Sequence, residues 1–170
     1  MQATLFSRTA VAVISLTLLV SCGEDFAGAN SFQARYSNAR DALEKGDYQK
    51  ASRAYGKLLD QAGPLRPRLQ LEYAHSELRL GNYASAARLA GEVAQTQKGD
   101  ARGAALTVFA TAQHELALLY LEKGETDAAK PLLKSARSAM AEVVKSYPEL
   151  DPLNAMSARK AAIDAQLKRL

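Results

Sequence analysis

Few side chains in this sequence are of types that carry out covalent chemistry, and their spacing forms no catalytic pattern. The chain has one cysteine, Cys22, and two histidines, His75 and His114. A single cysteine excludes an internal disulfide, and zinc sites built on thiolates usually draw their ligands in pairs. No HExxH, GxSxG or glycine-rich phosphate pattern occurs, and His75 and Ser76 are helix neighbours that point in different directions. We therefore expect no enzyme, no metal and no cofactor.

Cys22 stands at the end of a hydrophobic leader. Within residues 1–21 the one charged side chain is Arg8, and the uncharged run 9–20 that follows is shorter than the ~20 apolar residues that span a bilayer. A basic start with a short apolar run is typical of a secretory signal peptide. Residues 19–22, Leu-Val-Ser-Cys, resemble the bacterial lipobox, in which the cysteine receives a diacylglycerol on its sulfur before cleavage. A secretory leader with a chance cysteine is the alternative.

The lipobox resemblance implies a lipid-anchored protein whose mature chain begins at Cys22. Several acyl chains such as palmitate on one cysteine form a durable tether, whereas a single chain binds membranes only marginally. An aspartate after the cysteine favours inner-membrane retention in diderm bacteria, but here Gly23 follows it. We therefore expect an outer-membrane anchor with the domain facing the periplasm. Residues 22–30 have two glycines and no apolar period, which predicts a lipidated cysteine followed by a short tether.

The composition beyond the leader indicates a helical domain. The chain contains 33 alanines and 24 leucines, whereas only five Val and Ile residues follow position 20. Alanine and leucine lose little free energy on entering a helix, while β-branched residues favour strands. The sequence predicts an all-α domain over residues 31–170. The formal net charge of the whole chain, +4, is small and does not favour nucleic-acid binding.

A repeat becomes visible when three glycines, Gly46, Gly81 and Gly124, are aligned. A leucine lies three residues before each glycine, and an alanine lies seven residues before and five residues after it. The six alanines are Ala39, Ala51, Ala74, Ala86, Ala117 and Ala129. These offsets predict a helix that stops at each glycine and a second helix that follows it.

This pattern resembles the tetratricopeptide repeat (TPR), a pair of antiparallel helices of about 34 residues with a small residue in each helix and a glycine at the turn. The resemblance implies a right-handed superhelix of about three helix pairs. The predicted pairs cover residues 32–63, 67–97 and 101–146. The repeats are divergent, since Arg35, Gln70 and Gln113 fill the position of the family tryptophan and the third turn lacks its aromatic residue.

The last segment predicts a solitary helix over residues 152–169. Asp151 and Pro152 suit an N-cap and a first helical turn, and an apolar stripe follows at helical spacing. Such a helix can cover the exposed last repeat of a solenoid. Binding to a membrane surface is the alternative, because Arg159, Lys160 and Lys168 make the helix basic.

The resemblance also implies a binding groove, because the first helices of TPR pairs line a concave surface that holds peptides or partner helices. The groove positions of the family correspond here to the residues 13, 10, 6 and 2 places before each glycine. The residues that we expect to contact a partner are Tyr36, Arg40, Arg68, Leu71, His75, Arg79, His114 and Leu118, with Gln33, Glu44, Thr111 and Glu122 beside them.

These features predict a membrane-tethered scaffold that binds a protein partner and has no evident small-molecule substrate. The architecture is similar to that of TPR lipoproteins of β-barrel assembly and pilus biogenesis, which implies a role in envelope assembly. A regulatory accessory module of a cell-wall enzyme is the alternative.

Overall fold

The computed structural model describes residues 23–170, with side chains from Ser31 onward. Cys22 and the leader lie outside the described residues. The described part is all-α, which confirms the predicted fold class. Its α-helices are α1 (Gly23–Glu44), α2 (Tyr48–Leu58), α3 (Arg66–Arg79), α4 (Tyr83–Thr96), α5 (Gly99–Glu122), α6 (Thr126–Ser146) and α7 (Ala155–Leu167). Short 3₁₀ turns η2 (Leu59–Gln61), η3 (Gly63–Leu65) and η4 (Pro148–Leu150) join some of them.

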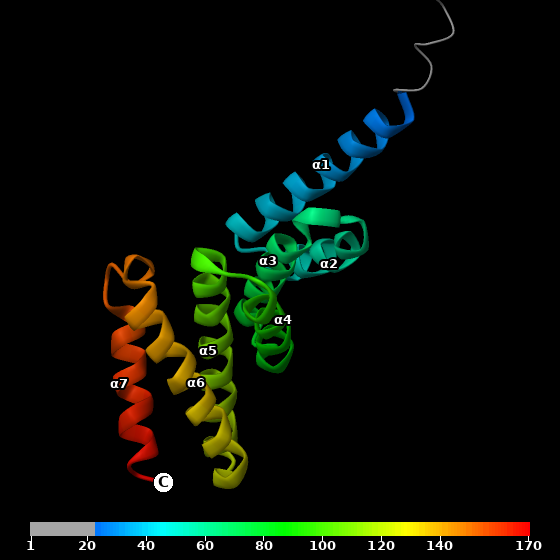
Figure 1. Ribbon diagram of the computed structural model, residues 1–170. Coiled ribbons are helices and arrows are strands. Elements are labelled where there is room, and N and C mark those ends of the chain that lie inside the picture. Colours follow the sequence, from blue (N-terminus) through cyan, green and yellow to red (C-terminus); the bar gives the residue numbers. More distant parts are fainter. Residues whose placement is uncertain (1–22) are drawn as a thin grey trace, which may run out of the picture.

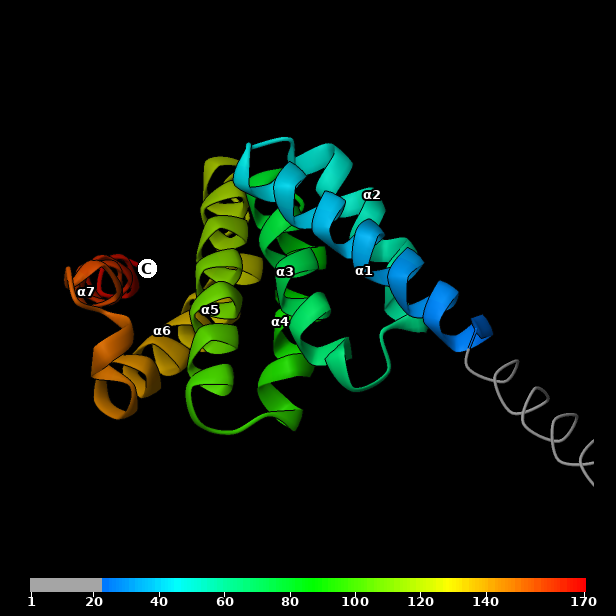
Figure 2. The ribbon, with the colours of Figure 1, turned by 90° about the horizontal axis from the view of Figure 1, so that it is seen from above.

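The helices form three consecutive pairs, α1/α2, α3/α4 and α5/α6, and α7 packs against the last pair (Figures 1 and 2). Most contacts join helices that follow one another in the chain, and α3 also touches α5. This neighbour-to-neighbour packing is that of a solenoid. We refer to each pair as a unit, and to α1, α3 and α5 as the first helices of the units.

The three turn glycines adopt the same left-handed conformation, with φ of +80° at Gly46, +80° at Gly81 and +75° at Gly124. A residue without a Cβ occupies this region at no steric cost, which explains the recurrent glycine. In each turn the next backbone N–H reaches five residues back. Asp47 donates to the Ala42 carbonyl at 2.8 Å, and the corresponding bonds in the second and third turns measure 2.9 and 2.8 Å. The first helix of each unit therefore ends in the same capping motif.

Six alanines mark the close contact between paired helices. All six residues found by aligning the glycines, seven positions before and five after them, are fully buried at 0% exposure. A methyl side chain at these points lets the two helix axes approach, and the half-buried leucines three residues before the glycines fill space nearby. The repeated spacing in the sequence is thus the spacing of the helix-pair contact.

The N-terminal end of α1 differs from the sequence prediction. Residues 23–30, predicted as a tether, are part of the helix, which runs without interruption from Gly23 to Glu44. Ala27 and Ala29 in this segment have high helix propensity. A polar segment without apolar period was therefore sufficient to extend the helix.

The start of α7 also differs from the prediction, because the helix begins at Ala155 after Asn154, which is left-handed at φ 55°. The carboxylate of Asp151 accepts hydrogen bonds from the backbone N–H of Met156 at 2.9 Å and of Ser157 at 3.0 Å. Burial acts to raise the pKa of Asp151, but these bonds outweigh it, so its pKa lies below the ordinary value. Asp151 caps the helix from four residues before it.

One helix in the described part of the chain, α5, is long and apolar enough to cross a membrane on length and composition alone. In the structure α5 packs between α4 and α6. It carries the buried His114, and Arg102 near its start pairs with Glu142 of α6 at 2.7 Å. The apolar composition of α5 is explained by its packing between α4 and α6.

Enlarging a contact alanine tests the packing directly. Ala86→Leu should lower the free energy of unfolding by about 1–3 kcal/mol, because the added atoms overpack a fully buried contact. Ala84→Leu, at an exposed position of the same helix, is the matched control and should leave stability nearly unchanged. Urea denaturation followed by circular dichroism measures both. Equal stability of the Ala86 variant and the wild type would contradict the alignment of the units.

Candidate functional site

Three of the four predicted groove positions remain accessible in every unit. The residues 13, 6 and 2 places before each turn glycine are exposed or half-buried. We call this set the open row; it consists of Gln33, Arg40 and Glu44, then Arg68, His75 and Arg79, and finally Thr111, Leu118 and Glu122. In the first unit the row borders a hollow of about 360 Å³ on α1. The hollow is lined by Gln33, Tyr36, Ser37, Arg40, Asp41 and Glu44.

The open row of the first two units is mainly cationic. Arg40 pairs with Glu44 at 3.1 Å, and its guanidinium also lies in the field of Glu72, which raises its pKa. Arg79 stacks over the ring of Tyr48, with 5.0 Å between the guanidinium carbon and the ring centroid. Partial burial, and then the charge of Arg79, lower the pKa of His75, so this side chain is neutral at neutral pH.

The fourth predicted position, ten residues before each glycine, has a different role. Tyr36, Leu71 and His114 each contact residues beyond their own unit, and Tyr36 also lines the hollow of the first unit. Leu71 packs against the buried cluster that contains Ala105 and Leu106 of α5. We call these three residues the junction positions.

At the first junction, Tyr36 and Glu72 join α1 to α3. The Tyr36 hydroxyl donates to Glu72 Oε1 at 2.9 Å, and Arg68 Nε donates to the same oxygen at 3.2 Å. The ring of Tyr36 meets that of Tyr55 from α2 edge to face, at 6.4 Å between centroids. Burial and the bond to Glu72 raise the pKa of Tyr36. Arg68 is thus an exposed member of the open row that also neutralises the junction carboxylate.

At the last junction, α7 covers His114, which corrects its prediction as a groove residue. His114 is 5% exposed, and its Nε2 lies 2.9 Å from Gln166 Oε1 of α7. Arg159 of α7 donates to His114 Nδ1 at 3.2 Å and to Glu115 at 2.6 Å. This arrangement requires the proton on Nε2, and burial lowers the pKa of His114. Helix α7 occupies the place that a further first helix would take.

The sequence analysis did not single out Glu72, although this carboxylate holds the first junction together. Its signal in the sequence is weak, since a glutamate on a helix is most often a solvated surface residue. Its importance depends on Tyr36, which lies 36 positions earlier in the chain. Among the described residues no group of three His, Cys, Asp or Glu side chains could hold a metal ion.

The comparison with protein families agrees with this geometry. Residues 36–102 match a tetratricopeptide repeat family. Residues 36–102 are therefore a TPR region. The match covers the span from Tyr36 of α1 to Arg102 near the start of α5, so it includes most of the first two units. Comparisons with curated proteins and with solved structures gave no match. TPR regions are generally scaffolds for protein interaction rather than catalysts.

Removing one hydroxyl tests the first junction. Tyr36→Phe should lower the free energy of unfolding by about 1 kcal/mol, because the half-buried Glu72 loses a hydrogen-bond donor. Tyr73→Phe is the matched control, since no hydrogen bond of the Tyr73 hydroxyl is found among the described residues. Combining Tyr36→Phe with Glu72→Gln in a double-mutant cycle isolates the pair. Additive effects in the cycle would show that the two side chains are not coupled.

Proposed function

We propose that this protein is a membrane-tethered TPR scaffold that docks a partner protein in the bacterial cell envelope. The observation that carries the proposal is the open row, which presents charged and polar side chains along successive first helices while the junction positions hold the fold. Side chains that contribute little to stability are free to be used in recognition. Because Arg40, Arg68 and Arg79 dominate the row in the first two units, the partner segment should carry carboxylates.

The proposed tether is the acylated Cys22. Its support is the lipobox-like sequence at residues 19–22 and the helix α1, which begins at the next residue. Gly23 supports export to the outer membrane, with the units facing the periplasm. On this basis the scaffold belongs to an assembly process of the outer membrane or of pili, as in lipoproteins of similar architecture.

Neutralising two members of the open row tests the docking surface. Arg40→Gln combined with Arg79→Gln should weaken capture of the partner several-fold, since exposed ion pairs contribute about 0.2–1 kcal/mol each. Glutamine is preferred to glutamate because a new carboxylate at position 40 would face Glu44 and Glu72. The measurement is a pull-down from envelope extracts with quantitative mass spectrometry.

The control for this pull-down is Arg88→Gln combined with Lys145→Gln. Arg88 of α4 forms an exposed pair with Glu92 four residues on, as Arg40 does with Glu44, but it lies outside the open row. Circular dichroism should show intact helicity for both variants. Loss of the same captured proteins in both variants, or in neither, would place the docking surface elsewhere.

Replacing Cys22 tests the tether. Cys22→Ser should abolish incorporation of labelled palmitate and release or stall the protein, because no other side chain of the chain can form the thioether. Metabolic labelling followed by fractionation of the envelope measures both effects. Palmitate in the variant, or its absence from the wild type, would refute the lipoprotein assignment.

A further inference from the structure

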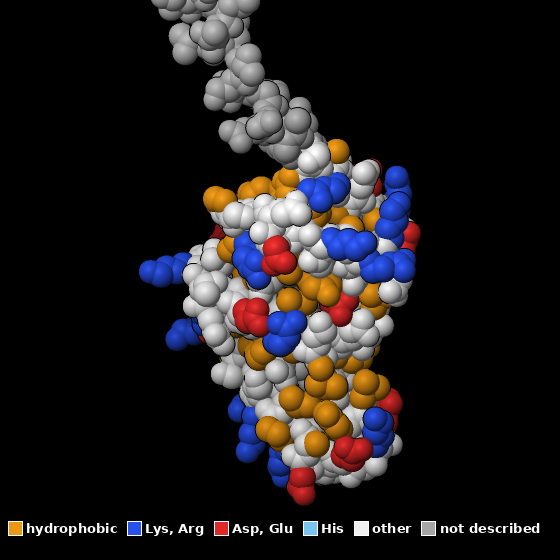
Figure 3. Space-filling model, turned by 90° about the vertical axis from the view of Figure 1, so that its right-hand side faces the viewer, with side chains coloured by type: hydrophobic (Ala, Val, Ile, Leu, Met, Phe, Trp, Pro, Cys, Tyr) orange, Lys and Arg blue, Asp and Glu red, His pale blue; other side chains and the backbone are white. Residues whose placement is uncertain are grey.

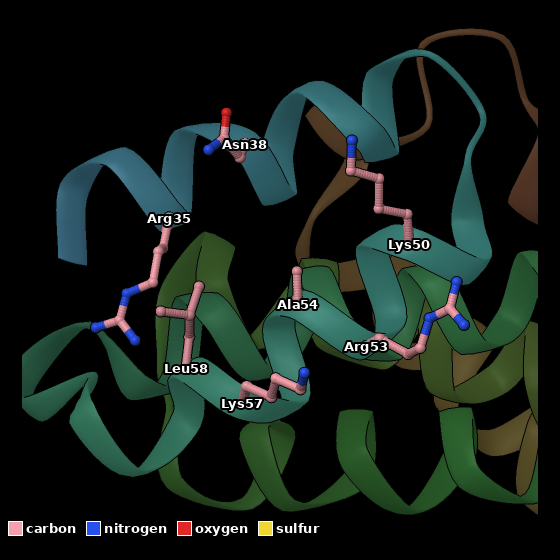
Figure 4. Close-up of a pocket in the computed structure, with 7 residues that line it drawn as sticks. All are labelled: Arg35, Asn38, Lys50, Arg53, Ala54, Lys57 and Leu58. Carbon is pink, nitrogen blue, oxygen red and sulfur yellow. The ribbon is translucent and has the colours of Figure 1, made fainter. Parts of the chain in front are cut away.

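Four cationic side chains face one hollow on the first unit. Lys50, Arg53 and Lys57 follow one another along α2, and Arg35 extends from α1 toward the end of α2 that carries Leu58 (Figure 4). The hollow measures about 330 Å³, and its lining is completed by Asn38, Ala54 and Leu58. Lys and Arg side chains gather over α1 and α2 in the upper part of Figure 3. We call Arg35, Lys50, Arg53 and Lys57 the basic face.

The charges of the basic face are not compensated. Within the described part of the chain, Lys50, Arg53 and Lys57 form no ion pair. Arg35 donates only to uncharged acceptors, the side-chain oxygen of Gln61 at 2.5 Å and the carbonyl of Ser31 at 3.2 Å. Helix α2 itself contains no Asp or Glu.

This arrangement contrasts with most other arginines of the described residues, although Arg79 and Arg169 also form no ion pair there. The arginines at positions 40, 66, 68, 88, 102, 137 and 159 each pair with a carboxylate. Like charges three or four residues apart on a helix destabilise it slightly. The basic face therefore carries a small cost in free energy that an external anion would relieve.

We propose that the basic face binds the phosphate groups of anionic lipid headgroups and thereby sets how the tethered domain lies on its membrane. Lys50 and Lys57 are seven residues apart, which is about 10 Å along a helix. A row of this length exceeds one phosphate group and suits a surface that presents several. Each Lys or Arg close to an anionic bilayer strengthens binding to it.

The position of the basic face relative to the anchor decides the orientation. This step rests on the proposed tether at Cys22. Arg35 lies twelve residues after Gly23, which is about 18 Å along α1, whereas the field of a charged surface decays within about 8–10 Å. The basic face reaches the headgroups only when α1 lies along the bilayer instead of standing upright on it.

This orientation has a consequence for docking. A helix turns by about 100° per residue, so Arg35 and Asn38 project from roughly the opposite side of α1 to Tyr36 and Arg40. With the basic face on the bilayer, the hollow beside the open row points away from the membrane. The same contact that holds the first unit down therefore presents its docking surface to the periplasm.

Amine labelling tests the contact. The full chain, purified from membranes, is reconstituted into vesicles of phosphatidylcholine alone or of phosphatidylcholine and phosphatidylglycerol in equal parts. Acetylation of each lysine is then measured by mass spectrometry. We expect several-fold slower acetylation of Lys50 and Lys57 in the anionic vesicles and reversal of this protection by high salt. Lys123 and Lys145, exposed lysines at the α5–α6 turn and at the end of α6, serve as internal controls and should be unaffected.

Variants distinguish binding through the basic face from nonspecific attraction of a cationic protein to an anionic bilayer. Arg35→Gln combined with Arg53→Gln should remove the protection of Lys50 and Lys57. Arg88→Gln combined with Arg169→Gln removes the same charge elsewhere on the surface and should preserve the protection. Equal labelling of Lys50 and Lys57 in the two kinds of vesicle, with the protein sedimenting with both, would overturn the proposal and leave the tether standing.

Two soluble probes distinguish other ligands. Pyrophosphate added to the phosphatidylcholine sample should protect the two lysines much less than the anionic bilayer does, and equal protection would assign the site to a free phosphate compound instead. Protection by a polyglutamate peptide without protection by anionic vesicles would assign it to an acidic protein. Protection in anionic vesicles of a protein that does not sediment with phosphatidylcholine would support the basic face and refute the tether.

Discussion

Close approach of paired helices at fully buried alanines is the constraint on which the rest of the structure depends. Ala39 faces the contact from α1 and Ala51 from α2, and the second and third units repeat this pair. A methyl group is the largest side chain that these contacts accept without rearrangement. The left-handed glycine at each turn supplies the reversal that brings the two alanines together. The packing of the two helices decides which of the remaining side chains of the first helix face the next unit and which face solvent.

The junction positions show that the residue type between units can vary while the packing within each unit stays the same. The residue ten places before the glycine is a tyrosine, a leucine and a histidine in the three units, and each side chain suits the helix that it meets. Tyr36 donates to a carboxylate of α3, Leu71 enters an apolar cluster, and His114 lies between Gln166 and Arg159 of α7. In a solenoid each unit contacts only its neighbours, so the side chains at one junction can differ from those at the others.

The difference between contacts within a unit and contacts between units explains which features could be predicted from the sequence. The turns and alanine contacts depend on residues at most twelve positions apart, so their period is visible along the chain. The junctions depend on partners much farther away, so the hydrogen bond between Tyr36 and Glu72 leaves no visible period in the sequence. The helical start of α1 was missed for another reason, because no apolar period is needed where a helix extends beyond its packing partners.

The last junction also limits where a partner can bind. Because α7 closes the third unit through Gln166 and Arg159, the succession of first helices ends at α5. The third unit adds a half-buried leucine and one exposed carboxylate to the open row, whereas the first two units supply its cationic residues. These two units also coincide with the region that matches the TPR family and with the end of the domain nearest the proposed anchor. The proposed docking surface and the proposed membrane contact therefore both lie in the first two units, whereas α5, α6 and α7 form the closed end of the solenoid.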